Sequence, residues 1–228
     1  MSSPTDASSL DKTVLAVSLA SSVLYLFQVR FTPSYSRMLV KTASTALLSY
    51  LSHLLNGPQF LTGALALGSL GDAFLAWHGD TAFLCGLSSF LVAHIGYILL
   101  FLQEQPAAGF QTLLQEGWRT ATAGGLVVLV SFMMAMLMPK VGKALRVPVL
   151  VYSLTICVMA LTALTLESGR VIVGATMFTA SDSILAADKF LVPGTAAQEY
   201  RALMQRAVWV LYYGGQALIA LGFVEPAL

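Results

Sequence analysis

The chain contains a series of apolar segments, each close to the length that crosses a lipid bilayer. About 20 mostly apolar residues span the hydrocarbon core as a helix, and lipid leaves every backbone polar group to be satisfied within the protein. The sequence therefore predicts an all-α fold, a polytopic transmembrane helical bundle of about eight spans in one integral membrane domain over residues 1–228. The predicted spans are 12–29, 38–55, 60–77, 82–102, 122–139, 147–166, 170–188 and 206–223.

The composition agrees with this fold class. Of the residues, 57% are hydrophobic and only 10% are charged, whereas a soluble domain is about 25% charged. A formal net charge of +1, without a basic run, argues against a nucleic-acid partner. Cys85 and Cys157 both lie inside apolar segments, and no Cys/His cluster has the spacing of a zinc site. The sequence thus predicts no metal and no other cofactor.

The basic residues predict an orientation. One side of the predicted bundle carries eight of them, and the other side carries three. Because cytoplasmic loops are enriched in Lys and Arg, the richer side is predicted to be cytosolic and both termini lumenal or exterior. Residues 1–11 are expected to form a flexible lumenal amino terminus. In the loop 189–205, Pro193-Gly194 precedes an amphipathic piece, Glu199 to Arg206, expected at the membrane interface. The eight basic residues on the predicted cytosolic side are Arg30, Arg37, Lys140, Lys143, Arg146, Lys189, Arg201 and Arg206.

Two of the predicted spans carry an aspartate in a similar local sequence. Leu70-Gly71-Asp72-Ala73-Phe74-Leu75-Ala76 in the third span corresponds to Ala180-Ser181-Asp182-Ser183-Ile184-Leu185-Ala186 in the seventh. Each aspartate lies about 12 residues past the start of its span, roughly 18 Å into a core about 30 Å thick. Their separation of about 110 residues across four spans predicts a 4+4 parallel repeat, as in membrane transporters.

A carboxylate at this depth is costly to hold, so its presence indicates a function or a specific partner. Small residues beside both aspartates let helices approach closely, so Asp72 and Asp182 can meet across a helix pair. Two carboxylates in an apolar site repel, and one then holds a proton while the other is ionised. That is a general acid beside a general base. The structural alternative is a buried aspartate that pairs with Lys41 or hydrogen-bonds a neighbouring helix.

Other polar residues also fall within predicted spans. Lys41 can neutralise a carboxylate, contact a phosphate together with Arg37, or snorkel to the interface. Gln216 in the core of the last span needs a partner, for which a substrate or a water is a candidate. Residues near span ends, such as Asp188, are expected to be solvated. The candidate binding residues are Lys41, His94, Tyr97, Ser181, Tyr212, Tyr213 and Gln216.

These residues resemble those of the YhhN-like membrane proteins, a family that includes the animal lysoplasmalogenases. The most specific parts of the resemblance are the Ser181-Asp182 block and the Tyr212-Tyr213/Gln216 block, and the likeness covers most of the chain. The remaining matching positions are Lys41, Gly71-Asp72, Phe74-Leu75, Phe90, His94, Tyr97, Gly174-Ala175, Phe178, Leu185-Ala186 and Phe190.

The resemblance implies hydrolysis of the vinyl-ether bond of lysoplasmalogen in the endoplasmic reticulum membrane. The products would be a fatty aldehyde and glycerophosphocholine or glycerophosphoethanolamine. Asp72 and Asp182 would be catalytic, the partners would be the lysophospholipid substrate and membrane lipid, and the sequence leaves a homo-oligomer open. Two other classes fit the same aspartates: a proton-coupled membrane transporter and a lipid-binding scaffold in which they only set helix packing.

Overall fold

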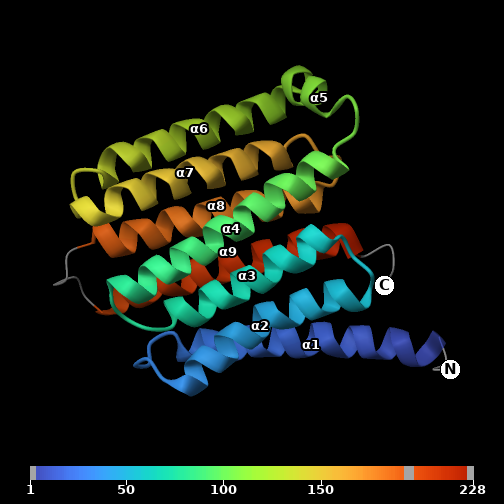
Figure 1. Cartoon of the computed structure of the whole chain (residues 1–228), viewed down its shortest axis with the longest axis horizontal. Coiled ribbons are helices and arrows are strands. Elements are labelled where there is room, and N and C mark those ends of the chain that lie inside the picture. The colour runs from blue at the N-terminus through green and yellow to red at the C-terminus, as the bar shows by residue number, and fades with distance from the viewer. Residues whose placement is uncertain (1–3, 193–197, 225–228) are drawn as a thin grey trace.

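The computed structural model describes residues 4–192 and 198–224, and all regular structure in these residues is helical. The long helices run alternately up and down one bundle, from α1 on one side to α6 on the other, and α1 begins at the end of the bundle where α9 finishes (Figure 1). The predicted all-α bundle is therefore confirmed. The helices are α1 (Pro4–Gln28), α2 (Tyr35–Leu54), α3 (Gln59–Leu75), α4 (Asp80–Glu104), α5 (Gly109–Gln115), α6 (Gly117–Leu137), α7 (Lys143–Ala163), α8 (Gly169–Phe190) and α9 (Gln198–Val224).

Each predicted span falls on one of the long helices, but several boundaries differ. The short helix α5 lies in the connection predicted at 103–121. The piece predicted to be amphipathic at 199–206 forms the first turns of α9, whereas Pro193-Gly194 lies outside the described residues. Residues 4–11 form the first turns of α1, and residues 1–3 are also outside the described part. The flexibility expected for 1–11 stays a prediction.

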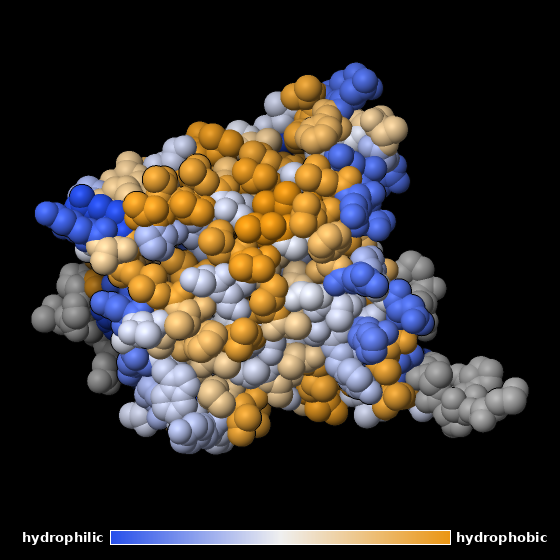
Figure 2. Space-filling model, viewed as in Figure 1, coloured by the Kyte–Doolittle hydropathy of each residue, from blue (hydrophilic) through white to orange (hydrophobic). Residues whose placement is uncertain are grey.

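The described helices have the surface of a membrane protein. Six of them are long and apolar enough to cross a bilayer by length and composition: α1 over Ser9–Gln28, α4, α6, α7, α8, and α9 over Tyr200–Val224. Hydrophobic residues fill the middle of the visible face, and hydrophilic residues gather at its two ends (Figure 2). The remaining long helices are α3, which has 17 residues, and α2, which is rich in Ser and Thr. The count of eight spans and the 4+4 repeat stay predictions.

The polar side of α2 faces into the bundle. In a membrane, polar side chains are stable where they meet partners on other helices, and the buried positions of α2 follow this rule. Ser49 donates to the Thr62 carbonyl of α3 at 2.8 Å, and Ser52 hydrogen-bonds the Thr62 hydroxyl at the same distance. The buried polar residues of α2 are Lys41, Ser44, Thr45, Ser49 and Ser52.

Close contacts between small residues fix the helix pairs that surround the two aspartates. A Cβ added to Gly174 of α8 would stand 2.7 Å from the Gly215 carbonyl oxygen of α9, and one added to Gly215 would stand 2.7 Å from the Gly174 oxygen. Gly71 of α3 lies equally close to the Phe90 ring of α4, at 2.6 Å for an added Cβ. Small residues at such crossings let helix backbones touch, so α8 packs on α9 and α3 packs on α4.

Candidate active site

Asp72 is held by three side chains from two other helices. Its Oδ1 lies 3.2 Å from Lys41 Nζ, and its Oδ2 accepts hydrogen bonds from Thr45 Oγ1 at 2.5 Å and Tyr212 OH at 2.8 Å. Lys41 and Thr45 are one helical turn apart on α2 and therefore present their polar ends to the same spot. Asp72 is 1% exposed and Lys41 is 8% exposed. Of the roles predicted for Lys41, the structure therefore has it neutralising a carboxylate.

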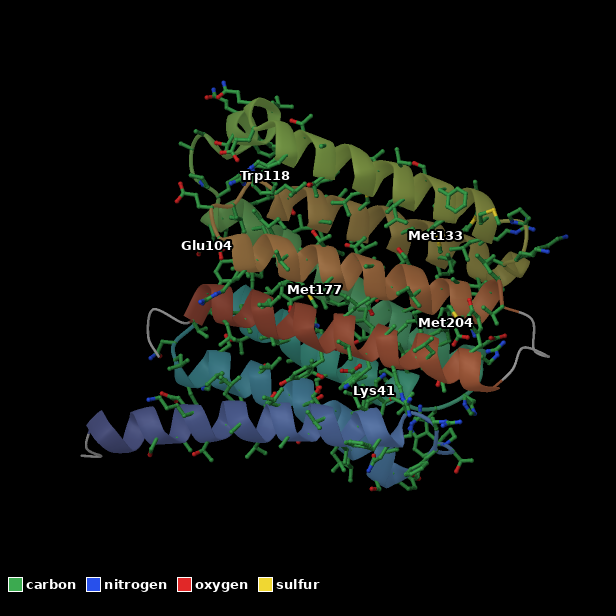
Figure 3. The ribbon with its side chains drawn as sticks, turned by 180° about the vertical axis from the view of Figure 1, so that it is seen from behind. Lys41, Glu104, Trp118, Met133, Met177 and Met204 are labelled. Carbon is green, nitrogen blue, oxygen red and sulfur yellow. The ribbon has the colours of Figure 1, made fainter. Side chains whose placement is uncertain are left out.

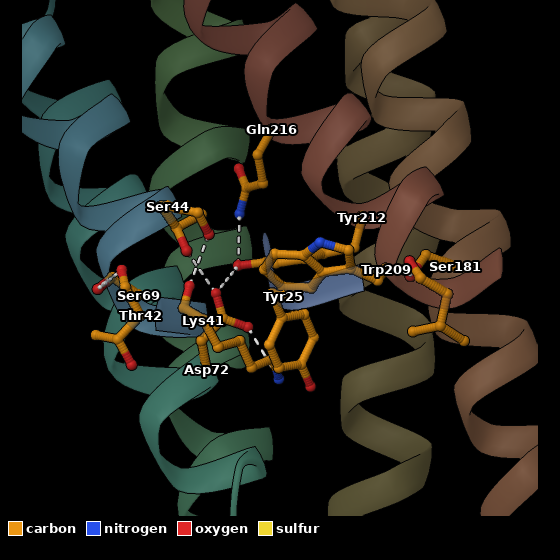
Figure 4. A network of polar contacts seen from close by, with 12 residues as sticks. Tyr25, Lys41, Thr42, Ser44, Ser69, Asp72, Ser181, Trp209, Tyr212 and Gln216 are labelled. Carbon is orange, nitrogen blue, oxygen red and sulfur yellow. Dashed lines mark hydrogen bonds and ion pairs between the residues drawn. The ribbon is translucent and has the colours of Figure 1, made fainter. Parts of the chain in front are cut away.

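A hydrogen-bonded pair, Tyr97 and Gln216, contacts the Tyr212 hydroxyl that binds Asp72. The Tyr97 hydroxyl donates to Gln216 Oε1, and Gln216 Nε2 donates to the Tyr212 oxygen at 3.5 Å. Gly68 makes room for this amide, because a Cβ there would stand 2.9 Å from Gln216 Nε2. Gln216 thus finds its partners within the protein. Figure 4 shows Lys41, Tyr212 and Gln216 arranged around Asp72.

Aromatic rings enclose the ammonium of Lys41. Its Nζ lies 5.8 Å from the ring centres of both Tyr25 and Trp209. These two rings meet edge to face at 4.4 Å, and Arg37 donates to Tyr25 OH at 3.3 Å. A cation over an aromatic face gains electrostatic stabilisation that increases as water is removed. Tyr25 therefore contacts both positive charges, those of Lys41 and Arg37.

Asp182 has a partner of a different kind, a tyrosine hydroxyl. The Tyr152 hydroxyl of α7 donates to Asp182 Oδ2. The helices that carry the two aspartates are not a closely packed pair, because α3 packs on α2 and α4 whereas α8 packs mainly on α9. Instead, both carboxylates line one cavity, which we call the polar cavity, together with Arg37, Lys41 and Tyr212.

The polar cavity adjoins a second, apolar cavity between α4, α6, α7 and α8. The apolar cavity includes Val130, Met133 and Ile156 in its lining. Asp182 borders both cavities. The site thus joins a charged compartment to a hydrocarbon-like one, with a carboxylate at their boundary.

The other candidate residues occupy different surroundings. Ser181 lines the polar cavity and donates to the Val208 carbonyl of α9 at 2.9 Å. The Tyr213 hydroxyl hydrogen-bonds Ser18 of α1 at 2.8 Å, on the side of α9 that faces α1. His94 is fully buried: its Nδ1 lies 2.6 Å from the Phe90 oxygen, and its Nε2 has no partner among the described residues. Its ring contacts Tyr152 edge to face at 5.3 Å.

One expectation about a charged residue at a span end is wrong. Asp188 is 7% exposed and pairs with Arg201 of α9 at 3.3 Å, so it is not a solvated carboxylate. Hydropathy places it near the end of α8, but α9 begins early enough to cover it.

Sequence reasoning missed Thr45 and Tyr152, the hydroxyl partners of the two aspartates. Thr45 had a usable signal, since it follows Lys41 by four residues on one face of a helix. For Tyr152 the sequence signal was weaker: a polar hydroxyl within an otherwise apolar segment. Among the described residues, no three His, Cys, Asp or Glu side chains come together as a metal site would require.

The fold and the site together define a polytopic helical membrane protein with two aspartates facing one internal cavity. The model of the YhhN family matches residues 36–223, and the chain belongs to that family. It is 31% identical over 173 residues to a protein of Mycobacterium bovis (strain ATCC BAA-935 / AF2122/97) named lysoplasmalogenase, a match that covers 72% of this chain and 60% of the relative.

Two animal proteins are similar to the same extent. The human protein named lysoplasmalogenase TMEM86B is 29% identical over 167 residues, covering 72% of this chain and 62% of its own length. The Bos taurus protein named lysoplasmalogenase TMEM86A is 32% identical over 174 residues, covering 71% and 63%. The chain thus spans about three fifths of the length of the relatives it matches. No solved structure matches the chain significantly.

Proposed function

We propose that this protein is a lysoplasmalogenase, which hydrolyses the vinyl-ether bond of lysoplasmalogen to a fatty aldehyde and glycerophosphocholine or glycerophosphoethanolamine. The observation that carries the proposal is the polar cavity, in which Asp72 and Asp182 face the same space with different partners. The names of the relatives support the same reaction. The substrate would bring an anionic phosphate, for which Arg37 and Lys41 supply positive charge at the cavity wall.

The reaction needs a proton donor and a water. Protonation of the vinyl-ether β-carbon gives an oxocarbenium ion, water adds to its carbon, and the hemiacetal then collapses to aldehyde and alcohol. One water is consumed overall, and the proton lent to carbon is regained from that water. Two carboxyl groups perform the same work in glycoside hydrolysis, which passes through a similar cation.

The contacts support different roles for the two aspartates. Asp72 accepts from an ammonium and two hydroxyl groups, which all favour a carboxylate, so we assign it the stabilisation of the cation and the activation of water. Asp182 has one neutral partner and borders the apolar cavity, so we assign it the proton donor. The residues that would orient the substrate or hold Asp72 in place are Lys41, Ser181, Tyr212 and the Tyr97–Gln216 pair. The cavity walls would be supported by His94 and Tyr213.

The test follows aldehyde release from lysoplasmalogen by the purified protein in detergent. Asp72→Asn and Asp182→Asn keep size and remove the charge or the acid, and each should lower turnover by at least about a hundredfold, the lower range for general acid–base groups. Glu104→Gln, an exposed carboxylate at the end of α4, is the matched control and should be fully active. Full activity in either aspartate variant would exclude that residue from the chemistry.

A proton-coupled transporter remains the alternative, because paired carboxylates inside a bundle also suit a proton relay. Transporters commonly break their helices at the binding site. Here α3 is unbroken up to its last turn, which contains Asp72, and α8 continues as one α-helix past Asp182; both observations favour a fixed site for chemistry. A well-folded protein that releases no aldehyde but takes up a solute in proteoliposomes would favour the transporter.

We further propose that the protein lies in the endoplasmic reticulum membrane with both termini lumenal. The loops between α1 and α2, and between α6 and α7, lie at the end of the bundle opposite to the start of α1 (Figure 1) and carry Arg30 and Lys140. Basic loops favour the cytosol. An N-glycosylation sequence placed before α1 should be glycosylated in cells, and one placed in the α6–α7 loop should not. The reverse pattern would overturn this orientation.

A further inference from the structure

The apolar cavity has a lining that suits a hydrocarbon chain. It lies between α4, α6, α7 and α8, and Asp182 stands where it meets the polar cavity. Most of its lining side chains are aliphatic or aromatic, and its polar members include the Tyr152–Asp182 pair. Figure 3 shows Met133, which lines this cavity, and Lys41, which lines the polar cavity, in the half of the bundle opposite Glu104 and Trp118.

The two cavities share part of their walls. Leu75, Phe83, Phe90, Asp182 and Leu185 line both of them. Beyond this shared wall, the polar cavity has the basic residues Arg37, Lys41 and Lys189 and two carboxylates, Asp72 and Asp188, each of which is paired with a basic residue. The apolar cavity has the side chains of α6 and α7. A molecule with one anionic head and one chain can therefore occupy both cavities, and the bond between head and chain then lies beside Asp182.

We infer that the apolar cavity is the subsite for the single hydrocarbon chain of the substrate, and that Val130 and Ile156 limit the length of chain it accepts. This inference rests on the proposed function, because it places the vinyl ether at Asp182. Among the cavity-lining residues of their helices, Val130 and Ile156 lie furthest from the α6–α7 loop. Both are buried, at 8% and 4% exposure, and line the part of the cavity furthest from that loop.

This subsite positions the hydrocarbon chain of the substrate and adds little to the binding affinity. Lipid tails are as apolar as leucine side chains, so moving a chain from a bilayer or micelle into the cavity gains little from the hydrophobic effect. A chain that fits nevertheless brings its first carbons to a fixed distance from Asp182. Filling the inner part of the cavity should therefore act by steric exclusion, against long chains and not against short ones.

The first test compares Val130→Trp with Val128→Trp on aldehyde release from lysoplasmalogens of graded chain length. Val130→Trp should lower kcat/KM for the longest chains by about tenfold or more, as overfilling a packed site does, and leave the shortest chains within about twofold of the wild type. Val128, on the same helix, is 68% exposed on the outer surface, so its variant should keep the wild-type profile. An equal loss at all chain lengths, or no change at any, would overturn the inference.

A second test does not depend on turnover. A lysophosphatidylcholine with a photoreactive diazirine at the end of its chain should label peptides of α6 and α7 near Val130 and Ile156. Val130→Trp should remove this label and Val128→Trp should retain it. Label confined to peptides of α1 and α9, or label unaffected by Val130→Trp, would refute the subsite. If the wild type releases no aldehyde but the labelling follows the expected pattern, the proposed reaction fails and the chain subsite stands.

Discussion

Replacing Lys41 by methionine tests whether Asp72 depends on a buried cation. Methionine keeps a long apolar stem and removes the ammonium, whose Nζ lies 3.2 Å from Asp72 Oδ1. Both residues are nearly excluded from solvent, at 8% and 1% exposure. Removing one partner of a buried ion pair costs about 3–5 kcal/mol, because the other charge stays buried without compensation. We therefore expect Lys41→Met to lower the free energy of unfolding by about that amount.

The double variant distinguishes the pair from its separate members. Lys41→Met combined with Asp72→Asn removes both charges together, so the combined loss should be well below the sum of the two single losses. We expect a coupling energy of at least about 2 kcal/mol, above the average of about 0.6 kcal/mol for interhelical hydrogen bonds in a membrane bundle. Lys12→Met on the exposed side of α1 is the control and should leave stability unchanged within about 0.5 kcal/mol.

The assay is reversible unfolding of the four proteins of the cycle in a single detergent, followed by circular dichroism. Additive single losses would show that Lys41 and Asp72 are not energetically coupled, and a stable Lys41→Met variant would show that Asp72 is not held as a carboxylate. Either outcome would refute the division of roles between Asp72 and Asp182.

The remaining predictions concern a hydroxyl partner of Asp182 and two helix glycines. Tyr152→Phe should lower kcat by about tenfold with little change in KM, because it frees Asp182 without altering the cavity walls; an unchanged kcat would remove Tyr152 from the site. Gly174→Ala should destabilise the protein by about 1–3 kcal/mol, since its Cβ would stand 2.7 Å from the Gly215 carbonyl oxygen. Gly124→Ala on α6, where a Cβ meets nothing within 4 Å, should raise stability slightly by helix propensity, and thermal unfolding of both variants measures the contrast.

The local sequences around the two aspartates show which features of the fold can be predicted without the tertiary structure. Small residues in these segments predicted close helix packing, and α3 does pack closely on α4 at Gly71, as α8 does on α9 at Gly174. The partner helices could not be read in this way, since a small residue permits contact with any neighbour. Packing on α2 and α9 gave Asp72 its cation and hydroxyls, and packing on α7 gave Asp182 its tyrosine.

The partners of the two aspartates also share a pattern that cannot be found in a short stretch of the sequence. Asp72 of α3 binds Thr45 of the preceding long helix α2, and Asp182 of α8 binds Tyr152 of the preceding long helix α7. This correspondence is what a 4+4 repeat would produce. It depends on how each helix is rotated about its axis, and neighbouring helices set that rotation.

The sequence by itself determined the class of fold, the approximate ends of its long helices and the identity of the two aspartates that lie within apolar helices and line one cavity. These follow from local physics, because the length of an apolar segment and the cost of burying a charge do not depend on which helices are neighbours. Only the tertiary structure decided that Lys41 neutralises Asp72, that Asp182 borders two cavities and that Tyr213 faces α1. Those outcomes depend on contacts between residues up to 195 positions apart, which are set by helix packing and leave no mark in any single segment.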